Sequence, residues 1–248
     1  MRIAVAGGTG LVGRYVVEAL TAAGDEPVVL SPSRGVDLLT GMGLDEALAG
    51  TQAVVDVTNS PKSAAKPATQ FFQKAGRNLL AAEERAGVSH HLTLSIVGID
   101  RAAGFGYYRA KLAQEEVVRN GPVPWTILRA TQFHEFAEQT LAQISGPIAV
   151  APRMHSRPIA AREVGRSLAE LVKEKPRGHA PELAGPREEQ IVEMARTLLK
   201  AKHQHRLLVP VRLPGSAGAA MSGGALLPTG PGPRGVQTFE QWLAEHYA

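Results

Sequence analysis

The sequence predicts an α/β protein in which helices cover both faces of a parallel, doubly wound β-sheet. Short apolar stretches alternate with helical segments through the first 145 residues. These stretches are continuously apolar, which is typical of strands buried on both faces. The expected strands are Ile3–Ala6, Val28–Leu30, Ala53–Val57, Leu92–Ile96 and Trp125–Leu128. Right-handed crossovers would bring their C-terminal ends to one edge of the sheet, where ligands bind in such folds.

The segments between these strands have helical patterns, and the last hundred residues have a looser rhythm. The expected helices of the first part are Leu11–Ala23, Leu44–Ala49, Thr69–Ala86, Tyr107–Asn120 and Glu135–Ile144. Beyond Ser145 we expect strands at Ile148–Ala151 and Arg206–Leu213, and helices at Ile159–Lys173, Glu188–Lys202 and Thr238–Tyr247. Thr238 is the expected N-cap of the last helix. The Gly- and Pro-rich segment Pro214–Pro233 predicts a loop with one short helix.

The bulk properties exclude several classes of protein. The 248 residues contain no cysteine, so disulfides, thiolate zinc sites and cysteine nucleophiles are excluded. The net charge of +4 is dispersed, which argues against nucleic acid as a partner. No apolar run approaches the roughly 20 residues that span a bilayer, and we see no signal peptide. We therefore expect a cytoplasmic protein without a membrane partner.

A glycine turn follows the first strand directly and leads into a helix. Gly8, Gly10 and Gly13 fit the pattern G-x-G-x-x-G, and Gly7, Gly10 and Gly13 fit the related G-x-x-G-x-x-G. Backbone N–H groups at a helix N-terminus bind a pyrophosphate well, and glycines let it approach. This turn predicts a dinucleotide site. Its expected residues here are Gly7, Thr9, Gly10, Leu11, Val12 and Gly13.

The end of the second strand favours NADP over NAD. In NAD-preferring sites a carboxylate at this position bonds the ribose hydroxyls, whereas here the chain has Ser31, Ser33 and Arg34. A guanidinium suits a 2′-phosphate. Asp37 and Leu38 are candidates to flank the adenine, although Asp37 is equally well explained as a turn residue, and we include Thr58, after the third strand, among the cofactor-binding residues.

Three residues around the fourth strand and the helix after it predict hydride-transfer chemistry. Tyr107 and Lys111 are four residues apart and share one helix face, and Ser95 lies twelve positions before the tyrosine. A neighbouring ammonium lowers the pKa of a phenol, so the tyrosine can act as general acid or base while the serine holds a carbonyl oxygen. Tyr108 competes with Tyr107 for this role, because a helix start can slip by one residue.

These motifs resemble the short-chain dehydrogenase/reductases, specifically their atypical, NmrA-like and isoflavone-reductase-like branch. The resemblance is carried by residues 7–13, 95–98, 107–111 and 125–133 and covers about residues 1–165 well. It implies a Rossmann fold, a catalytic tyrosine at Tyr107, a lysine at Lys111 that also bonds the nicotinamide ribose, and a substrate-orienting serine at Ser95. It further implies that Ala130, Thr131 and Phe133 border the nicotinamide.

We expect residues 1–145 to form the NAD(P)-binding region and residues 146–248 a small C-terminal substrate lobe, in one integrated domain. The candidate substrate residues are Phe133, His134, Phe136, Met154 and His155, although ordinary packing explains them equally well. His90 and His91 are expected at the surface, and no metal is assigned.

The preferred function is an NADP-dependent oxidoreductase acting on a small carbonyl, enone or quinone. Two alternatives stay open. One is an NADP-binding, redox-sensing regulatory protein that acts through a protein partner without turnover. The other, ranked lower, is a nucleotide-sugar epimerase or dehydratase.

Overall fold

The computed structural model describes residues 1–62 and 64–247. The chain forms two compact units, each built from separate segments. The first unit contains residues 1–95, 106–129 and 162–180, and the second contains residues 96–105, 130–161 and 181 onward. The boundary expected after residue 145 therefore falls inside the second unit.

The first unit contains a six-stranded sheet with the order β2-β1-β3-β4-β5-β8. The strands are β1 Arg2–Ala6, β2 Glu26–Leu30, β3 Ala53–Asp56, β4 His90–Ile96, β5 Trp125–Ala130 and β8 Gly178–His179. Strand β1 pairs in parallel with both β2 and β3, with Ile3 opposite Pro27 on one side and Ala53 on the other. The β3/β4 and β5/β8 pairs are also parallel. The predicted parallel sheet is confirmed, and its strand order reverses between β1 and β3.

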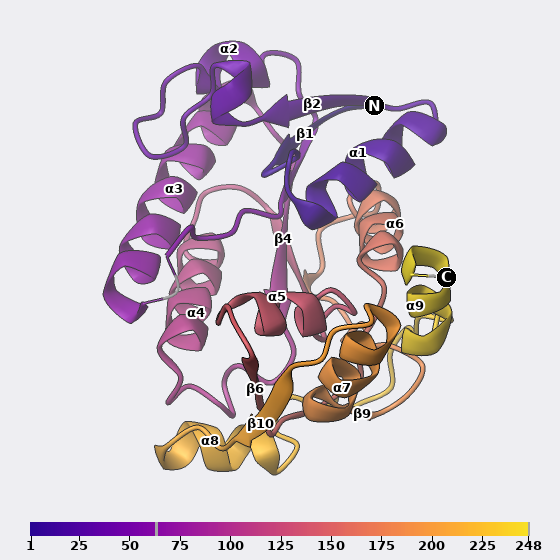
Figure 1. Cartoon of the computed structure of the whole chain (residues 1–248). Helices are drawn as coiled ribbons and strands as arrows, with labels where there is room; N and C mark the ends of the chain where they lie inside the picture. Colours follow the sequence, from indigo (N-terminus) through magenta and orange to yellow (C-terminus); the bar gives the residue numbers. More distant parts are fainter. Residues whose placement is uncertain (63, 248) are drawn as a thin grey trace. The chain divides into compact units, whose positions relative to one another are not determined.

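Helices cover both faces of this sheet, as the sequence predicts. In Figure 1, α2 (Leu44–Leu48), α3 (Ala65–Ala86) and α4 (Gly106–Arg119) lie on one side, and α1 (Leu11–Ala22) and α6 (Ala161–Leu171) on the other. Helices α1 and α6 approach closely because Gly165 has no side chain; a Cβ there would lie 2.5 Å from the Cβ of Tyr15. The unit is a Rossmann-type, doubly wound α/β fold.

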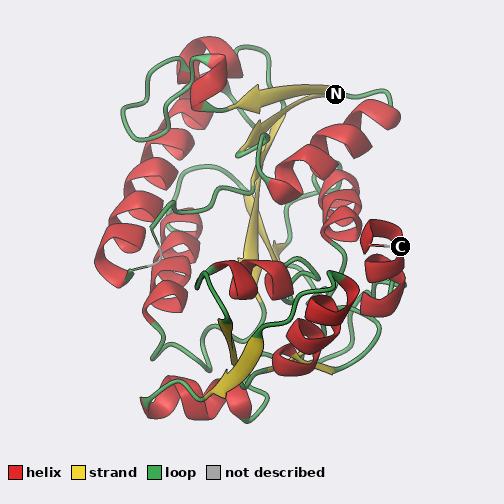
Figure 2. Cartoon of the chain, in the orientation of Figure 1, coloured by secondary structure: helices red, strands yellow, loops and turns green. Residues whose placement is uncertain are grey.

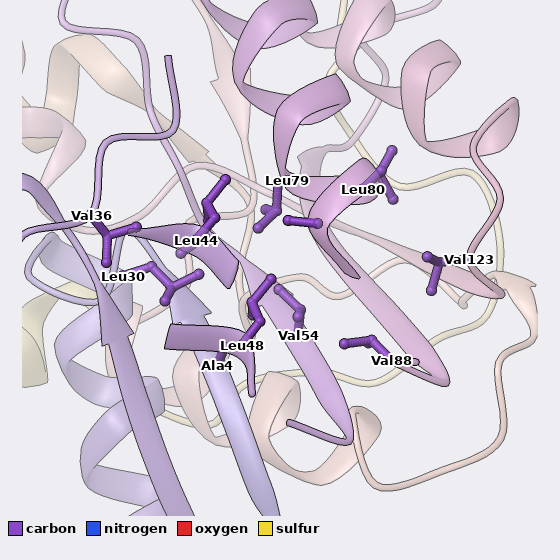
Figure 3. Close-up of a cluster of buried hydrophobic side chains, with 12 residues drawn as sticks. Ala4, Leu30, Val36, Leu44, Leu48, Val54, Leu79, Leu80, Val88 and Val123 are labelled. Carbon is purple, nitrogen blue, oxygen red and sulfur yellow. The ribbon is translucent and has the colours of Figure 1, made fainter. Parts of the chain in front are cut away.

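The core of the first unit includes a cluster between the sheet and the helices on the α2–α3 side. Leu30, Leu48, Val54 and Leu79 lie at its centre, and each is at most 1% exposed. Figure 3 shows these side chains pointing toward one another from strands and helices far apart in the sequence. Burial from both faces explains why the strands lack an apolar/polar alternation.

The expectation that His90 and His91 lie at the surface is wrong. Both are buried, and each ring nitrogen has a hydrogen-bond partner. His90 bonds the hydroxyl of Thr126 and the carbonyl oxygen of Val172. His91 bonds Glu83 and Thr93. Buried polar groups are stable when they are hydrogen-bonded, and both partners of His90 are distant from it in the sequence.

The second unit contains two small sheets and four helices among its described residues (Figure 2). Strand β6 (Ile148–Pro152) pairs in parallel with β10 (Leu207–Val211), and β7 (His155–Ser156) pairs antiparallel with β9 (Glu189–Gln190). The helices are α5 Phe136–Ala142, α7 Ile191–Ala201, α8 Gly215–Ser222 and α9 Phe239–Tyr247. Thr238 caps α9 as predicted. Its hydroxyl accepts from Gln241 N at 3.3 Å, and its own N–H donates to the Gln241 side chain at 2.9 Å.

Two helices begin later than the sequence predicts, because the residues expected to start them are extended and form strand-like backbone hydrogen bonds instead. Ile159 exchanges backbone hydrogen bonds with Gln132 and His134, so α6 begins at Ala161. Residues 189 and 190 pair with β7, so α7 begins at Ile191. Strands β7, β8 and β9 have two residues each and no pattern that could predict them.

Candidate functional site

The glycine turn joins β1 to α1 and presents the helix N-terminus. Gly10 is the N-cap and has no side chain to satisfy the helix, so the N–H groups of Leu11, Val12 and Gly13 have no partner inside it. Gly7 has a φ of +80°, a left-handed conformation that favours glycine. A Cβ on Gly7 would lie 3.0 Å from the carbonyl oxygen of Val57 and 3.1 Å from the Thr58 nitrogen. Thr58 thus lies beside the turn, at the point where the strand order reverses.

Gly13 is required by the close packing of α1 against this turn. A Cβ there would lie 2.1 Å from the carbonyl oxygen of Gly7 and 2.6 Å from the Cα of Gly8. A Cβ on Gly10 would lie 3.2 Å from the same oxygen, a tight contact that a small shift could relieve. The exposed Thr9 completes the turn. The arrangement suits a pyrophosphate at the amino end of α1.

The residues after β2 form a polar corner with an exposed guanidinium. Pro32–Arg34 make one turn of 3₁₀-helix. The buried Ser31 and the exposed Ser33 place their hydroxyl oxygens 3.0 Å apart, and Arg34 is exposed. The backbone hydrogen bond from Leu39 is the main reason that the pKa of Asp37 is lowered. The carbonyl oxygen of Leu38 accepts from the amide of Asn78 at 2.8 Å.

The phenol of Tyr107 is near the start of α4 and donates a hydrogen bond to Asn59, in the loop after β3. The expectation that the Lys111 ammonium lowers the pKa of this phenol is wrong: burial raises the pKa of Tyr107 to about 12, so the hydroxyl remains protonated at physiological pH. The neighbouring Tyr108 is 6% exposed, and burial raises its pKa as well. The greater accessibility of Tyr107 favours it over Tyr108 as the candidate acid.

Lys111 directs its ammonium group into the interior. It donates to the carbonyl oxygen of Leu94 at 2.8 Å and to the side chain of Gln114, which in turn donates to Asp56 at 2.8 Å. The ammonium also lies 4.9 Å from the ring centroid of Phe72. Burial lowers the pKa of Lys111 to about 8, although the carboxylates of Asp56 and Glu115 oppose this shift. The lysine is therefore held by the backbone of β4 and by a side chain of its own helix.

Ser95 lies near the end of β4 and points at α4. Its hydroxyl donates to Glu115 at 2.6 Å, and both groups are buried. Glu115 also accepts two hydrogen bonds from the guanidinium of Arg129, at 2.9 and 2.8 Å. The single hydroxyl hydrogen of Ser95 is thus used within this network.

The candidate residues from the loop after β5 belong to the second unit. Ala130 and Thr131 are buried, and the Thr131 hydroxyl donates to the carbonyl oxygen of Arg157. Phe133 and Phe136 are half-buried. The ring of His134 is buried among aromatic side chains, 5.7 Å from Phe239 between centroids.

The remaining two substrate candidates, Met154 and His155, are adjacent but differ in surroundings. Met154 is 1% exposed. His155 bonds Glu188 at 3.0 Å and also Gln190. It lines a pocket of about 390 Å³ within the second unit. The pocket is lined by Arg153, His155, Gln190, Val192, Glu193, Arg196, Pro210 and Ser222.

Four residues of this region were not predicted from the sequence, because they belong to no recognised motif: Asp56, Asn59, Gln114 and Glu115. Gln114 and Glu115 follow Lys111 on the same helix, and their polarity on an inward-facing helix surface was the available signal. Among residues 1–62 and 64–247, no group of three or more His, Cys, Asp or Glu side chains could hold a metal ion. No helix in the same part of the chain is long and apolar enough to cross a membrane.

Comparison with known sequences identifies the family. The NAD(P)H-binding domain family matches residues 7–175, and the chain belongs to this family. No curated protein matches the sequence. The glycine turn fits a nicotinamide dinucleotide, which this family binds. Glycines stand where the turn packs most closely, so no side chain at these positions covers the amino end of α1.

Solved structures share the fold over the whole chain. The NADPH-dependent quinone oxidoreductase of Escherichia coli, complexed with NADPH, is 18% identical, with a TM-score of 0.72 over 99% of this chain and 100% of that one. The dTDP-4-dehydrorhamnose reductase of Bacillus anthracis, complexed with NADP, is 13% identical, with a TM-score of 0.73 over 99% and 98%. A short-chain dehydrogenase/reductase superfamily protein of Agrobacterium tumefaciens with bound NAD is 18% identical, with a TM-score of 0.68 over 99% and 95%.

Proposed function

We propose that the protein is an NADPH-dependent oxidoreductase of the short-chain type that reduces a small, mostly apolar carbonyl, enone or quinone. Membership of the NAD(P)H-binding family supports the cofactor class. The observation that carries the chemistry is Tyr107, an accessible phenol one helical turn before Lys111. Burial raises its pKa to about 12, so it holds a proton for the substrate oxygen. This favours the direction of reduction.

Different residues of the first unit are proposed to bind different parts of the cofactor. The N–H groups at the start of α1 would bind the pyrophosphate, and Ser31, Ser33 and Arg34 would bind the 2′-phosphate. Lys111 would bond the nicotinamide ribose once its ammonium group leaves the Leu94 carbonyl and Gln114. When bound, the reduced nucleotide supplies the hydride. Tyr107 delivers the proton, and Ser95 orients the carbonyl once its hydroxyl exchanges Glu115 for the substrate.

The substrate side of the site is proposed from the loop after β5. The family resemblance implies that Ala130, Thr131 and Phe133 border the nicotinamide, and this stays a prediction. Phe133, Phe136 and His155 have accessible side chains and stay the candidate substrate residues, whereas the buried His134 and Met154 support the packing of the second unit.

The test is NADPH oxidation with a panel of ketones, enones and quinones, comparing the wild type with Tyr107→Phe. We expect the variant to lower kcat for ketones by about 10²–10⁴-fold, the usual contribution of a general acid. The affinity for NADPH, measured by calorimetry, should stay within about twofold, because the variant leaves the glycine turn unchanged.

Tyr108→Phe is the matched control, since it makes the same chemical change one residue along the helix. It should leave kcat within about twofold of the wild type. Equal losses in the two variants, or a larger loss in Tyr108→Phe, would remove Tyr107 from the proposed role.

A second candidate is a protein that binds NADPH and signals its redox state to a protein partner without turnover. The inward direction of Lys111 and the bond from Ser95 to Glu115 favour it, because both groups are engaged within the protein. NADPH binding without reduction of any member of the panel would support this candidate.

A further inference from the structure

The hydrogen bond between Tyr107 and Asn59 joins two elements that lie far apart in the sequence. Asn59 is an exposed residue in the loop after β3, three residues beyond Asp56, the last residue of that strand. The phenol hydroxyl donates to its side-chain oxygen. The ring of Tyr107 is fixed on another side by Phe72, with an edge-to-face contact at 6.1 Å between centroids. The ring and the hydroxyl of Tyr107 are thus each held by a specific neighbour.

Lys111 does not supply this contact, although it is on the same helix. Its ammonium bonds the Leu94 carbonyl and Gln114, and burial is the cause of the raised pKa of Tyr107. The group that meets the reacting hydroxyl is therefore a neutral amide. We propose that Asn59 is a positioning residue for Tyr107, holding the phenol proton before transfer and stabilising the phenolate after it. This inference depends on the proposed reductase function.

An amide side chain can form a hydrogen bond with Tyr107 both as the protonated phenol and as the phenolate. Its oxygen accepts the hydroxyl hydrogen but does not take the proton, so Tyr107 remains an acid. During reduction the O–H bond of Tyr107 breaks, an O–H bond forms on the substrate oxygen, and hydride comes from the reduced nucleotide. Rotation of the amide by about 180° then presents an N–H donor to the phenolate. Water restores the proton after product release.

A carboxylate at position 59 would stabilise only the protonated phenol of Tyr107. It accepts the hydroxyl hydrogen, but its charge opposes formation of a phenolate beside it. A neutral carboxylic acid has an acceptor and a donor, as the amide has. Asn59→Asp should therefore be active where the new carboxyl is protonated and lose activity where it ionises.

The experiment measures kcat for ketone reduction against pH in the wild type, Asn59→Asp and Asn120→Asp. Asn120 is an exposed residue just after α4, so Asn120→Asp makes the same change away from the phenol. Between pH 5 and 8 we expect Asn59→Asp to lose about tenfold or more in kcat relative to wild type, with KM within about twofold. Asn120→Asp should follow the wild-type profile. Parallel profiles for all three proteins would overturn the inference.

A second measurement does not need a substrate. Incorporated 3-fluorotyrosine ionises at lower pH than tyrosine, and its ¹⁹F resonance reports the pKa at each of the four tyrosines. Tyr107→Phe assigns the resonance. Asn59→Asp should raise the pKa at position 107 by about one unit or more, and Asn120→Asp should not. An unchanged pKa would refute the role of Asn59, whereas failure of the proposed function would instead appear as wild-type turnover in Tyr107→Phe.

Discussion

His91 and Glu83 form a hydrogen-bonded pair with no exposed side-chain surface. Nδ1 of His91 lies 2.8 and 2.9 Å from the two carboxylate oxygens, and both side chains are 0% exposed. The pair joins β4 to α3 inside the first unit. Removing one member of such a pair leaves the other buried without its partner, which typically costs about 3–5 kcal/mol.

We therefore expect His91→Gln to lower the free energy of unfolding by about 3–5 kcal/mol near pH 6. Urea denaturation followed by circular dichroism measures this change. The control is His205→Gln, an exposed histidine that should change stability by less than about 0.5 kcal/mol. Similar small losses in both variants would show that the pair is not important for stability.

The same pair predicts how stability depends on pH. Burial opposes a charge on His91, but the carboxylate of Glu83 outweighs it, so the pKa of His91 is raised. Burial also raises the pKa of Glu83. A group with a raised folded pKa contributes stability below its unfolded pKa and loses it as pH rises. This contribution should decline above about pH 6.5, the unfolded value for histidine.

We expect the pH slope of stability above 6.5 to be less negative in His91→Gln than in the wild type. Urea titrations of both proteins from pH 6 to 9 provide the comparison. If stability changed equally with pH in the two proteins, the His91–Glu83 pair would not bind an additional proton on folding.

Gly13→Ala tests the glycine turn. The new Cβ would overlap the backbone of Gly7 and Gly8, so α1 must shift. Overpacking of this kind costs about 1–3 kcal/mol, and the displaced N–H groups should weaken NADPH binding by about tenfold or more. Thermal unfolding and calorimetry measure the two effects.

The control for this substitution is Gly230→Ala, where a Cβ would meet nothing within 4 Å. It should change neither stability nor affinity measurably. Wild-type affinity in Gly13→Ala would exclude the amino end of α1 as the pyrophosphate site.

The alternation of apolar runs with helical segments was enough to predict the parallel sheet, because its central strands β1 and β3 are short, mostly apolar and almost completely buried. The two-residue strands were not predictable, since they depend on tertiary pairing. Burial of His90 and His91 was missed for a similar reason: their apolar surroundings and most of their hydrogen-bond partners come from other elements.

Local geometry was predictable where spacing along one element sets it. The glycine turn lies at the start of α1 as expected, and Tyr107 and Lys111 are one turn apart on α4, but the spacing did not predict that the Lys111 ammonium bonds Leu94 and Gln114 and not the phenol. The hydrogen-bond partners of the candidate catalytic groups were not predictable. Asn59 and Tyr107 are 48 positions apart in the sequence, and Ser95 and Glu115 are 20 positions apart. Such contacts depend on how β3, β4 and α4 pack, which no local pattern encodes.

Arg34→Ala tests the preference for NADPH over NADH. Arg34 is exposed after the 3₁₀ turn, next to two serine residues whose hydroxyl groups are in contact. A hydrogen bond to a charged group contributes about 1.5–3 kcal/mol, so its loss should weaken NADPH binding by about 10–100-fold. NADH has no 2′-phosphate, and its affinity should change by less than about twofold. Fluorescence titration of both nucleotides gives the ratio. Arg119→Ala, at the exposed end of α4, should leave both affinities unchanged. If Arg34→Ala weakened NADPH and NADH equally, Arg34 would be a general contributor to the site and NADPH selection would have to come from other residues.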